Sequence, residues 1–312
     1  MQGRVWVVVG LFSFAAAARI SADDPAVLVP NSAVHKAGSG GAVKVTLENR
    51  GSQPLILSGW EVRKGASPVL QAPLQGVGAL LQPGQVLSFR WNKRTSNGEW
   101  VKSGSYRILA HVHVGAGDPK VFGVTVALTP SGKLAGSNPY PLAVGNKWTY
   151  RNQQGVLSIS EVTSSSEGGW YRMTNPPAGT GWVAVTGTTY PILWVWDGNT
   201  ARPFFRFRRP TGTEWQTGLP FYKTLRVAAT KVTLANGLGV FKNCSQIGTP
   251  PGLSSRSWWF APGFGTVKTQ SVAPNSMSLD GGVKASNPVA VRIRGTDGKW
   301  YLVEASHVRS SP

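Results

Sequence analysis

Apolar and polar residues alternate along much of this chain with the period of a β-strand. Val43, Val45 and Leu47 are separated by polar residues, so period two places all three on one face of a half-buried strand. We expect a turn at residues 48–51 after them. Turn dipeptides at residues 83–84 (Pro-Gly) and 97–98 (Asn-Gly) separate further short apolar runs. This pattern predicts antiparallel strands joined by short turns.

Composition points to the same fold class. The 312 residues include 38 Gly, 22 Pro and 13 Trp, whereas only 13 residues are acidic. Long helix-forming side chains are scarce, and turn and strand formers are abundant. We therefore predict an all-β protein. A chain of this length is typical of two domains.

A segment rich in Pro, Gly and Ser divides the chain into two modules. We place the first module at residues 25–130, the linker at 131–139 and the second module at 140–308. Residues 1–22 have a positive start at Arg4, an apolar stretch and small residues, which is the pattern of a secretory signal peptide. The apolar stretch is too short for a transmembrane helix, and no later stretch is long enough. We therefore expect the mature protein to be secreted or periplasmic and to have no transmembrane segment.

The chain is strongly basic, with a formal net charge of +19. Residues 133–312 contain 19 basic and 7 acidic residues, whereas residues 23–132 contain 11 and 6. Such an excess attracts polyanions at long range, whether nucleic acid, an anionic polymer of the cell envelope or an acidic protein surface. Charge alone gives no specificity, and the alternative is that it reflects solubility or a lineage-wide bias rather than a ligand site.

The densest basic segment is residues 202–210, Arg-Pro-Phe-Phe-Arg-Phe-Arg-Arg-Pro. On a strand, two phenylalanines would share one face, and the third would share the other face with arginines. Aromatic rings beside guanidinium groups can stack on bases or sugars and pair with phosphates or carboxylates. The alternative is an edge strand whose arginines prevent edge-to-edge association. The candidate binding residues are Arg202, Phe205, Arg206, Phe207, Arg208 and Arg209.

Tryptophan is abundant in the second module, at positions 170, 182, 194, 196, 215, 258 and 259. Exposed on one face, these rings would suit a carbohydrate, and buried they would form the core. Alternation places Trp194 and Trp196 on the same face, which favours the core.

Residues for catalysis or metal binding form no complete set in the sequence. His111 and His113 would share a strand face, a spacing compatible with two metal ligands, but no third ligand lies nearby. Acidic residues at 197, 280 and 297 each precede glycine, where a turn explains them. A pair such as Glu161 and Glu214 could still meet in a cleft, as a glycosidase requires. The single cysteine, Cys244, allows no internal disulfide and is expected in the core. We therefore expect no catalytic residues, no metal and no cofactor.

Part of the first module resembles a known family. Residues 81–91, followed by the Asn-Gly turn at 97–98 and the Gly-Ser-Tyr segment at 104–106, resemble the intracellular proteinase inhibitor domain of the BsuPI type. The resemblance covers residues 43–114 and implies an immunoglobulin-like β-sandwich and protease inhibition. Residues 68–78 depart from the family pattern, and no inhibitory loop can be transferred from it.

The second module resembles a group of secreted bacterial β-rich proteins without an assigned activity. The resemblance lies in residues 140–150, 239–244 and 261–268. It implies a larger antiparallel β module and no reaction. The leading prediction is a secreted, non-enzymatic protein that binds another macromolecule, with protease inhibition as its sharpest form and a protease or other protein as partner. The alternatives are a polysaccharide- or polyanion-binding envelope protein and a hydrolase with dispersed acids.

Overall fold

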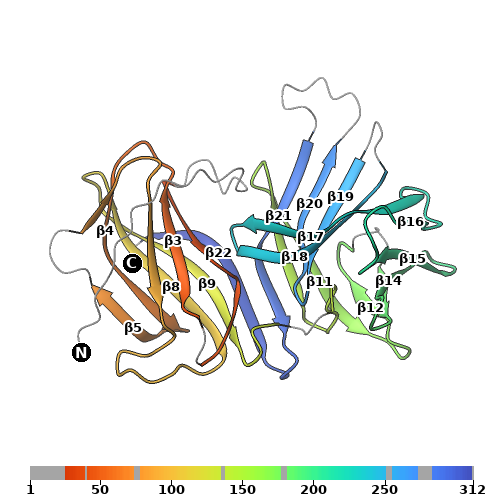
Figure 1. Ribbon diagram of the computed structural model, residues 1–312, viewed down its shortest axis with the longest axis horizontal. Coiled ribbons are helices and arrows are strands. Elements are labelled where there is room, and N and C mark those ends of the chain that lie inside the picture. The colour runs from red at the N-terminus through yellow and green to blue at the C-terminus, as the bar shows by residue number, and fades with distance from the viewer. Residues whose placement is uncertain are drawn as a thin grey trace. The chain divides into compact units, whose positions relative to one another are not determined.

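The computed structural model describes residues 25–38, 41–73, 78–134, 138–176, 181–250, 255–272 and 283–310. These residues form β-strands β1 to β22 and no helix (Figure 1), which confirms the all-β prediction. No segment of this described part is a helix long and apolar enough to cross a membrane. The predicted signal peptide, residues 1–22, lies outside the described residues.

The chain folds into two compact units. Unit 1 comprises the chain up to Gly132 together with Ala235–Val240 and the segment from Leu302 onward. Unit 2 comprises Lys133–Leu234 and Phe241–Tyr301. The boundary near Gly132 lies at the start of the expected linker. Two later segments, however, belong to unit 1 although they lie within the range expected for the second module.

Unit 1 is built from two sheets. Its strands are β1 (Ala26–Pro30), β2 (Val34–Lys36), β3 (Val43–Asn49), β4 (Leu55–Lys64), β5 (Ser67–Pro73), β6 (Ala79–Leu81), β7 (Val86–Trp91), β8 (Gly104–Val114), β9 (Pro119–Thr129) and most of β22 (Trp300–Ser310). The first sheet has the order β1-β3-β7. In the second, β4 pairs with β8 and β8 with β9, while β5 and β6 both pair with β4. β22 pairs with β9 antiparallel, and β2 pairs with β9 in parallel.

The core of unit 1 lies between these sheets. Val43, Val45 and Leu47 are buried, as the alternation predicted. Across the core, the ring of Trp60 on β4 stacks on Phe89 of β7 with centroids 4.9 Å apart. Apolar residues from both inner faces form one cluster, which makes unit 1 a β-sandwich.

The strand β3 runs further than expected. It continues through Asn49, which is fully buried, so the turn does not begin at residue 48. The side-chain amide of Asn49 donates hydrogen bonds to the carbonyl oxygens of Gln53 and Leu81, at 2.9 and 3.0 Å. A buried polar group persists only when it is hydrogen-bonded, and alternation of apolar residues gives no sign of such a position.

His35 on β2 gives unit 1 a predicted pH dependence. The pKa of His35 is lowered from 6.5 to about 4, mainly by burial. The hydrogen bond to the Ser32 carbonyl raises the pKa, and the nearby charge of Lys93 lowers it slightly further. The unfolded state therefore binds a proton that the folded state excludes. We expect stability to be fully present above pH 6.5 and to fall by about 2–3 kcal/mol as the pH drops toward 4.

Urea unfolding of the whole chain between these pH values measures this effect. In His35→Gln the loss of stability between these pH values should be smaller by that amount. An unchanged slope in His35→Gln would contradict the assignment.

Unit 2 is a larger set of antiparallel strands. Its strands are β10 (Lys147–Asn152), β11 (Leu157–Ser165), β12 (Tyr171–Met173), β13 (Trp182–Thr186), β14 (Ile192–Trp196), β15 (Ala201–Arg206), β16 (Glu214–Gln216), β17 (Thr224–Asn236), β18 (Gly239–Gly248), β19 (Ser255–Ala261), β20 (Gly265–Val272) and β21 (Val283–Arg294), with the tips of β17 and β18 belonging to unit 1. Strands β10 to β15 pair in sequence order. β10 also pairs with β21, and β18 to β21 pair in order (Figure 1).

The last hairpin shows how the chain returns to unit 1. Strands β21 and β22 flank the Asp-Gly turn at residues 297–298. From Leu302 onward, however, β22 lies in unit 1, where Glu304 is opposite Thr125 of β9. The Ser306 hydroxyl accepts a hydrogen bond from the backbone N–H of Leu28 at 3.1 Å. Pairing between strands this distant in sequence leaves no local pattern, so the partner of β22 could not be predicted from the sequence.

Candidate functional site

The aromatic side chains of the segment 202–210 lie in the core of unit 2. Phe204, Phe205 and Phe207 are at most 1% exposed. Phe205 packs against Trp258 and Phe260, with ring centroids 5.1 and 4.7 Å away. In this conformation these rings have no free face for an external base or sugar.

A β-bulge explains why the expected alternation fails here. On β15, Phe205 is opposite Leu193 whereas Pro203 is opposite Trp194, so Phe204 is the extra residue between them. A bulge interrupts the two-residue period and allows neighbouring side chains to enter the same core. The expectation that Phe204 shares a face with arginines is therefore wrong.

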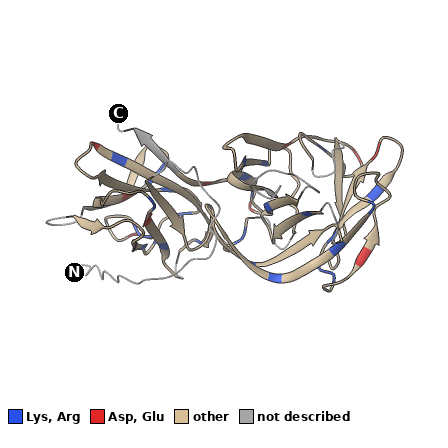
Figure 2. Cartoon of the chain, turned by 90° about the horizontal axis from the view of Figure 1, so that it is seen from above, with Lys and Arg blue, Asp and Glu red and all other residues tan. Residues whose placement is uncertain are grey.

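The arginines of this segment have separate environments. Arg202 Nε donates to Asp197 Oδ2 at 2.8 Å, and Arg208 donates to the Thr188 carbonyl at 2.8 Å. Arg209 stacks on the ring of Tyr190, 4.3 Å from its centroid. Arg206 is half-buried at the end of β15. Basic residues are also spread over other parts of the chain (Figure 2), so the positive charge is not confined to this segment.

The tryptophans of unit 2 divide into two sets. Trp215, Trp258 and Trp259 are buried, as a core role predicts. Trp194 and Trp196 share a face of β14, as expected, but Leu193 and Val195 supply the buried face. The prediction that both rings face the core is therefore wrong, and Trp196 is 39% exposed.

The candidate catalytic and metal-binding residues do not assemble. His111 Nε2 lies 3.2 Å from Glu61, which also pairs with Arg63 at 2.9 Å. Across the described residues, no three His, Cys, Asp or Glu side chains are grouped so as to hold a metal ion. Cys244 is buried, and burial raises the pKa of its thiol to about 12, which keeps it protonated.

The acidic candidates have structural partners. Asp197 accepts hydrogen bonds from the backbone of Asn199 and Thr200, and its pKa is lowered to about 2, first by Arg202 and then by these amides. Glu161 pairs with Lys147 and Arg292, whereas Glu214 lies exposed on β16. The candidate Asp280 lies outside the described residues.

The strongest candidate site is a cavity of about 480 Å³ in unit 2. Its lining residues are Tyr140, Tyr150, Ser158, Ser160, Asn175, Pro176, Gly181, Arg256, Trp258, Thr266, Thr269 and Ser286. This volume is within the range of small-molecule sites. Hydroxyl groups dominate the lining, and among these residues Arg256 carries the only formal charge.

Strand pairing brings these residues together. Trp258, Thr269 and Ser286 lie opposite one another on β19, β20 and β21 and form one row across the sheet. Tyr150 on β10 lies opposite Ser158 on β11. Paired residues point to the same face of a sheet, so the floor of the pocket crosses five neighbouring strands.

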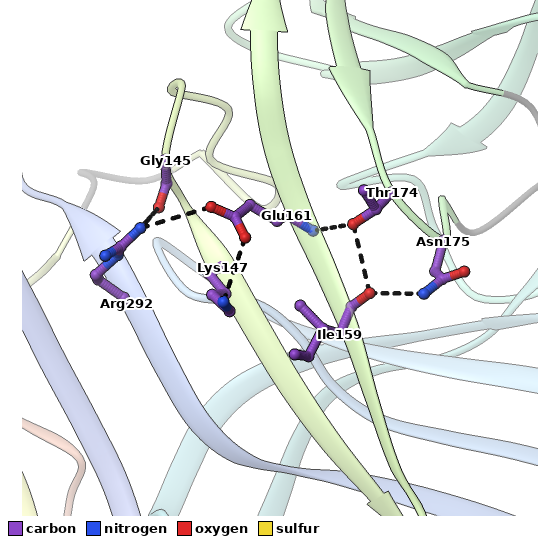
Figure 3. Close-up of polar contacts among 7 residues, drawn as sticks. All are labelled: Gly145, Lys147, Ile159, Glu161, Thr174, Asn175 and Arg292. Atoms are coloured by element: carbon purple, nitrogen blue, oxygen red, sulfur yellow. Dashed lines mark hydrogen bonds and ion pairs between the residues drawn. The ribbon is translucent and has the colours of Figure 1, made fainter.

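A polar network fixes the wall formed by Asn175 (Figure 3). The side-chain amide of Asn175 donates to the Ile159 carbonyl at 2.7 Å, as Figure 3 shows. The backbone carbonyl of Asn175 accepts a hydrogen bond from the Ser160 hydroxyl at 2.8 Å. The backbone N–H of Glu161 donates to Thr174 Oγ1 at 3.0 Å, while the Glu161 carboxylate pairs with Lys147 at 3.3 Å. These bonds hold the segment after β12 against β11.

The electrostatics of the pocket favour an anion. Arg256 donates to the Tyr222 hydroxyl at 2.5 Å and lies 5.2 Å from the ring centroid of Trp258, which fixes the guanidinium group. Burial raises the pKa of both Tyr140 and Tyr150 well above the usual value, against an opposing hydrogen bond from Thr266. Both phenols therefore remain protonated and can donate hydrogen bonds.

Sequence reasoning missed this site because its residues are ordinary. Serine, threonine and tyrosine occur throughout β-proteins, and only the pairing of five strands gathers them on one face. The segments at 140–150 and 261–268, singled out for their resemblance, do contribute Tyr140, Tyr150 and Thr266. No family model matches this chain, and no curated protein is significantly similar to it.

Proposed function

We infer that unit 2 binds an anionic carbohydrate, such as a uronic acid residue of an acidic polysaccharide, in the pocket at Arg256. The observation that carries this proposal is the combination of one fixed guanidinium group with many hydroxyl groups and no carboxylate among the described lining residues. A guanidinium group pairs well with a carboxylate, and it does so best where water is partly excluded. Hydroxyl groups match the alternating donors and acceptors of a sugar, and the Trp258 and tyrosine rings suit its apolar faces.

The proposed activity is binding without catalysis, since the lining residues that the structure describes include no carboxylate or imidazole for acid-base chemistry. The overall positive charge would attract an acidic polymer from a distance and make binding sensitive to salt. A secreted or periplasmic location, predicted from residues 1–22, would bring the protein to such polymers.

Calorimetric titration of the whole chain with galacturonate and glucuronate oligosaccharides tests this proposal. Replacing Arg256 by glutamine should weaken binding roughly 10- to 100-fold, because a charge-assisted hydrogen bond is lost while a shorter, neutral polar side chain remains. Arg209→Gln is the matched control, since Arg209 lies outside the pocket and should leave the affinity unchanged. Neutral oligosaccharides should bind this pocket more weakly than the acidic ones.

Equal losses in the two arginine variants would show that general basic charge, rather than the pocket, attracts the ligand. Absence of uronate binding by the wild-type chain would remove the proposal. Thermal unfolding of each variant separates loss of binding from loss of folding.

We also propose that unit 1 is an immunoglobulin-like module. The chain leaves the first sheet after β1, and β2 then pairs with β9 of the second sheet. This change of sheet supports the classification. The hydroxyl of Tyr106 near the start of β8 donates to the Lys102 carbonyl at 2.5 Å, and Trp60 on β4 is buried, both of which are features of such sandwiches. Protease inhibition by this unit stays a prediction of the family resemblance, to be tested by protease assays with the whole chain.

A further inference from the structure

Three tryptophans form a cage on the outer face of β12, β13 and β14. Because Val183 pairs with Val195 on the inner face, the residues beside them, Trp182 and Trp196, lie next to each other on the outer face. Trp170 precedes β12 and contacts Trp196 edge to face, with ring centroids 5.9 Å apart and an interplanar angle of 80°. With Ser166 the three rings line a cavity of about 350 Å³.

The indole groups of this cage are available to a ligand. Trp91, Trp148, Trp194 and Trp215 all donate their indole N–H to a protein acceptor. Within the described part of the chain, the indole N–H groups of Trp170, Trp182 and Trp196 make no such hydrogen bond. Because the rings of Trp170 and Trp196 are nearly perpendicular, the face of one ring and the N–H edge of the other can lie beside the same cavity. Packing of a hydrophobic core does not require this arrangement.

The charges around the cage favour a neutral ligand. Arg172 lies directly opposite Trp182 on β12 and is exposed, so a cationic ligand would enter beside a guanidinium group. Glu167 is exposed in the turn after Ser166, so its carboxylate would repel an anionic ligand. Asp197, which follows Trp196, is already neutralised by Arg202.

We propose that this tryptophan cage binds a sugar ring of a neutral glycan. The C–H faces of a pyranose pack on indole rings, and its hydroxyl groups can accept from the indole N–H groups and donate to the Ser166 hydroxyl. This site is independent of the pocket at Arg256, because none of its lining residues belongs to that pocket and its ligand needs no charge.

The test is calorimetric titration of the whole chain with cellohexaose, maltohexaose, laminarihexaose and chitohexaose. At least one of them should bind, and Trp196→Ala should weaken that binding about tenfold or more, because it removes a whole stacking face. Trp100→Ala is the matched control, since Trp100 in unit 1 is 43% exposed compared with 39% for Trp196. Arg256→Gln should leave unchanged the part of the neutral binding that Trp196→Ala removes.

Several outcomes would overturn the proposal. These are the absence of binding to all four oligosaccharides, equal effects of the two tryptophan variants, and loss of that same part of the neutral binding in Arg256→Gln. Tetramethylammonium chloride is titrated in parallel, and binding of this cation that Trp196→Ala abolishes would assign the cage to a cationic ligand instead. Because Trp196 is partly exposed, its replacement should leave the thermal unfolding temperature close to that of the wild type, and Trp182→Phe, which keeps a ring, should retain part of the affinity.

Discussion

Replacing Phe205 by alanine is expected to destabilise unit 2 by about 3–5 kcal/mol, the usual cost of removing a buried aromatic side chain. Phe205 is fully buried and contacts the rings of Phe204, Phe207, Trp258 and Phe260. The cavity left behind would lie between β15 and β19, where the neighbouring large rings cannot close it without leaving their preferred positions. If the segment 202–210 were instead a binding strip with exposed rings, the same change would alter stability by less than about 0.5 kcal/mol.

The single cysteine allows this effect to be measured in unit 2 alone. Cys244 is buried on β18 within the part of the chain assigned to unit 2, so its reaction with a thiol reagent reports the opening of that unit. The urea concentration at which Cys244 becomes reactive should fall in Phe205→Ala. The control is Arg209→Ala in the same segment. Arg209 stacks on Tyr190 outside this aromatic core, so its replacement should leave the midpoint nearly unchanged. A similar small effect in both variants would contradict the core role of Phe205.

Replacing Gly239 by alanine is expected to destabilise unit 1 by about 2–4 kcal/mol, because it combines backbone strain with a steric overlap. Gly239 begins β18 with a φ of 132°, which side chains rarely adopt. An added Cβ would lie 2.9 Å from the Ala33 nitrogen and 3.0 Å from the Pro30 carbonyl oxygen. These are backbone atoms, so they cannot move aside as a flexible side chain would.

Gly198→Ala separates the two contributions. Gly198 has a φ of 106° but no atom within 4 Å of an added Cβ, so only backbone strain should appear, at about 1 kcal/mol. Hydrogen exchange of peptides from β1 and β9 would measure the loss in unit 1 for Gly239→Ala. Equal destabilisation by the two substitutions would show that the close approach of residues 30–33 to Gly239 contributes nothing.

The two proposed sites differ in how they could be found. The cage at Trp170, Trp182 and Trp196 uses a residue type that sequence analysis had singled out, and only the assignment of the face was wrong. The pocket at Arg256 uses residues that carry no signal in sequence. Together, the proposed site for an acidic sugar and the proposed site for a neutral sugar on one unit would suit a ligand with several sugar rings.

The local pattern of the sequence determined the fold class and many of the strands. Alternation at Val43, Val45 and Leu47 predicted a strand whose inner face is indeed buried, because the two-residue period follows from the geometry of the backbone itself. The Pro-Gly turn at 83–84 and the Asp-Gly turn at 297–298 are also in place, since glycine permits the positive φ of 79° and 75° found there.

Tertiary structure alone decided which face is buried, which strands are neighbours and where a site arises. Alternation says that Trp194 and Trp196 share a face, but it cannot say whether that face meets the core. A bulge at Phe204 changed the direction of its neighbours, and pairing of β22 with β9 joined segments nearly 180 residues apart, such as Thr125 and Glu304. The pocket at Arg256 depends on the register of five strands. Register is set by packing across the whole sheet, and for this reason the chemistry of this protein became visible only when its strands were paired.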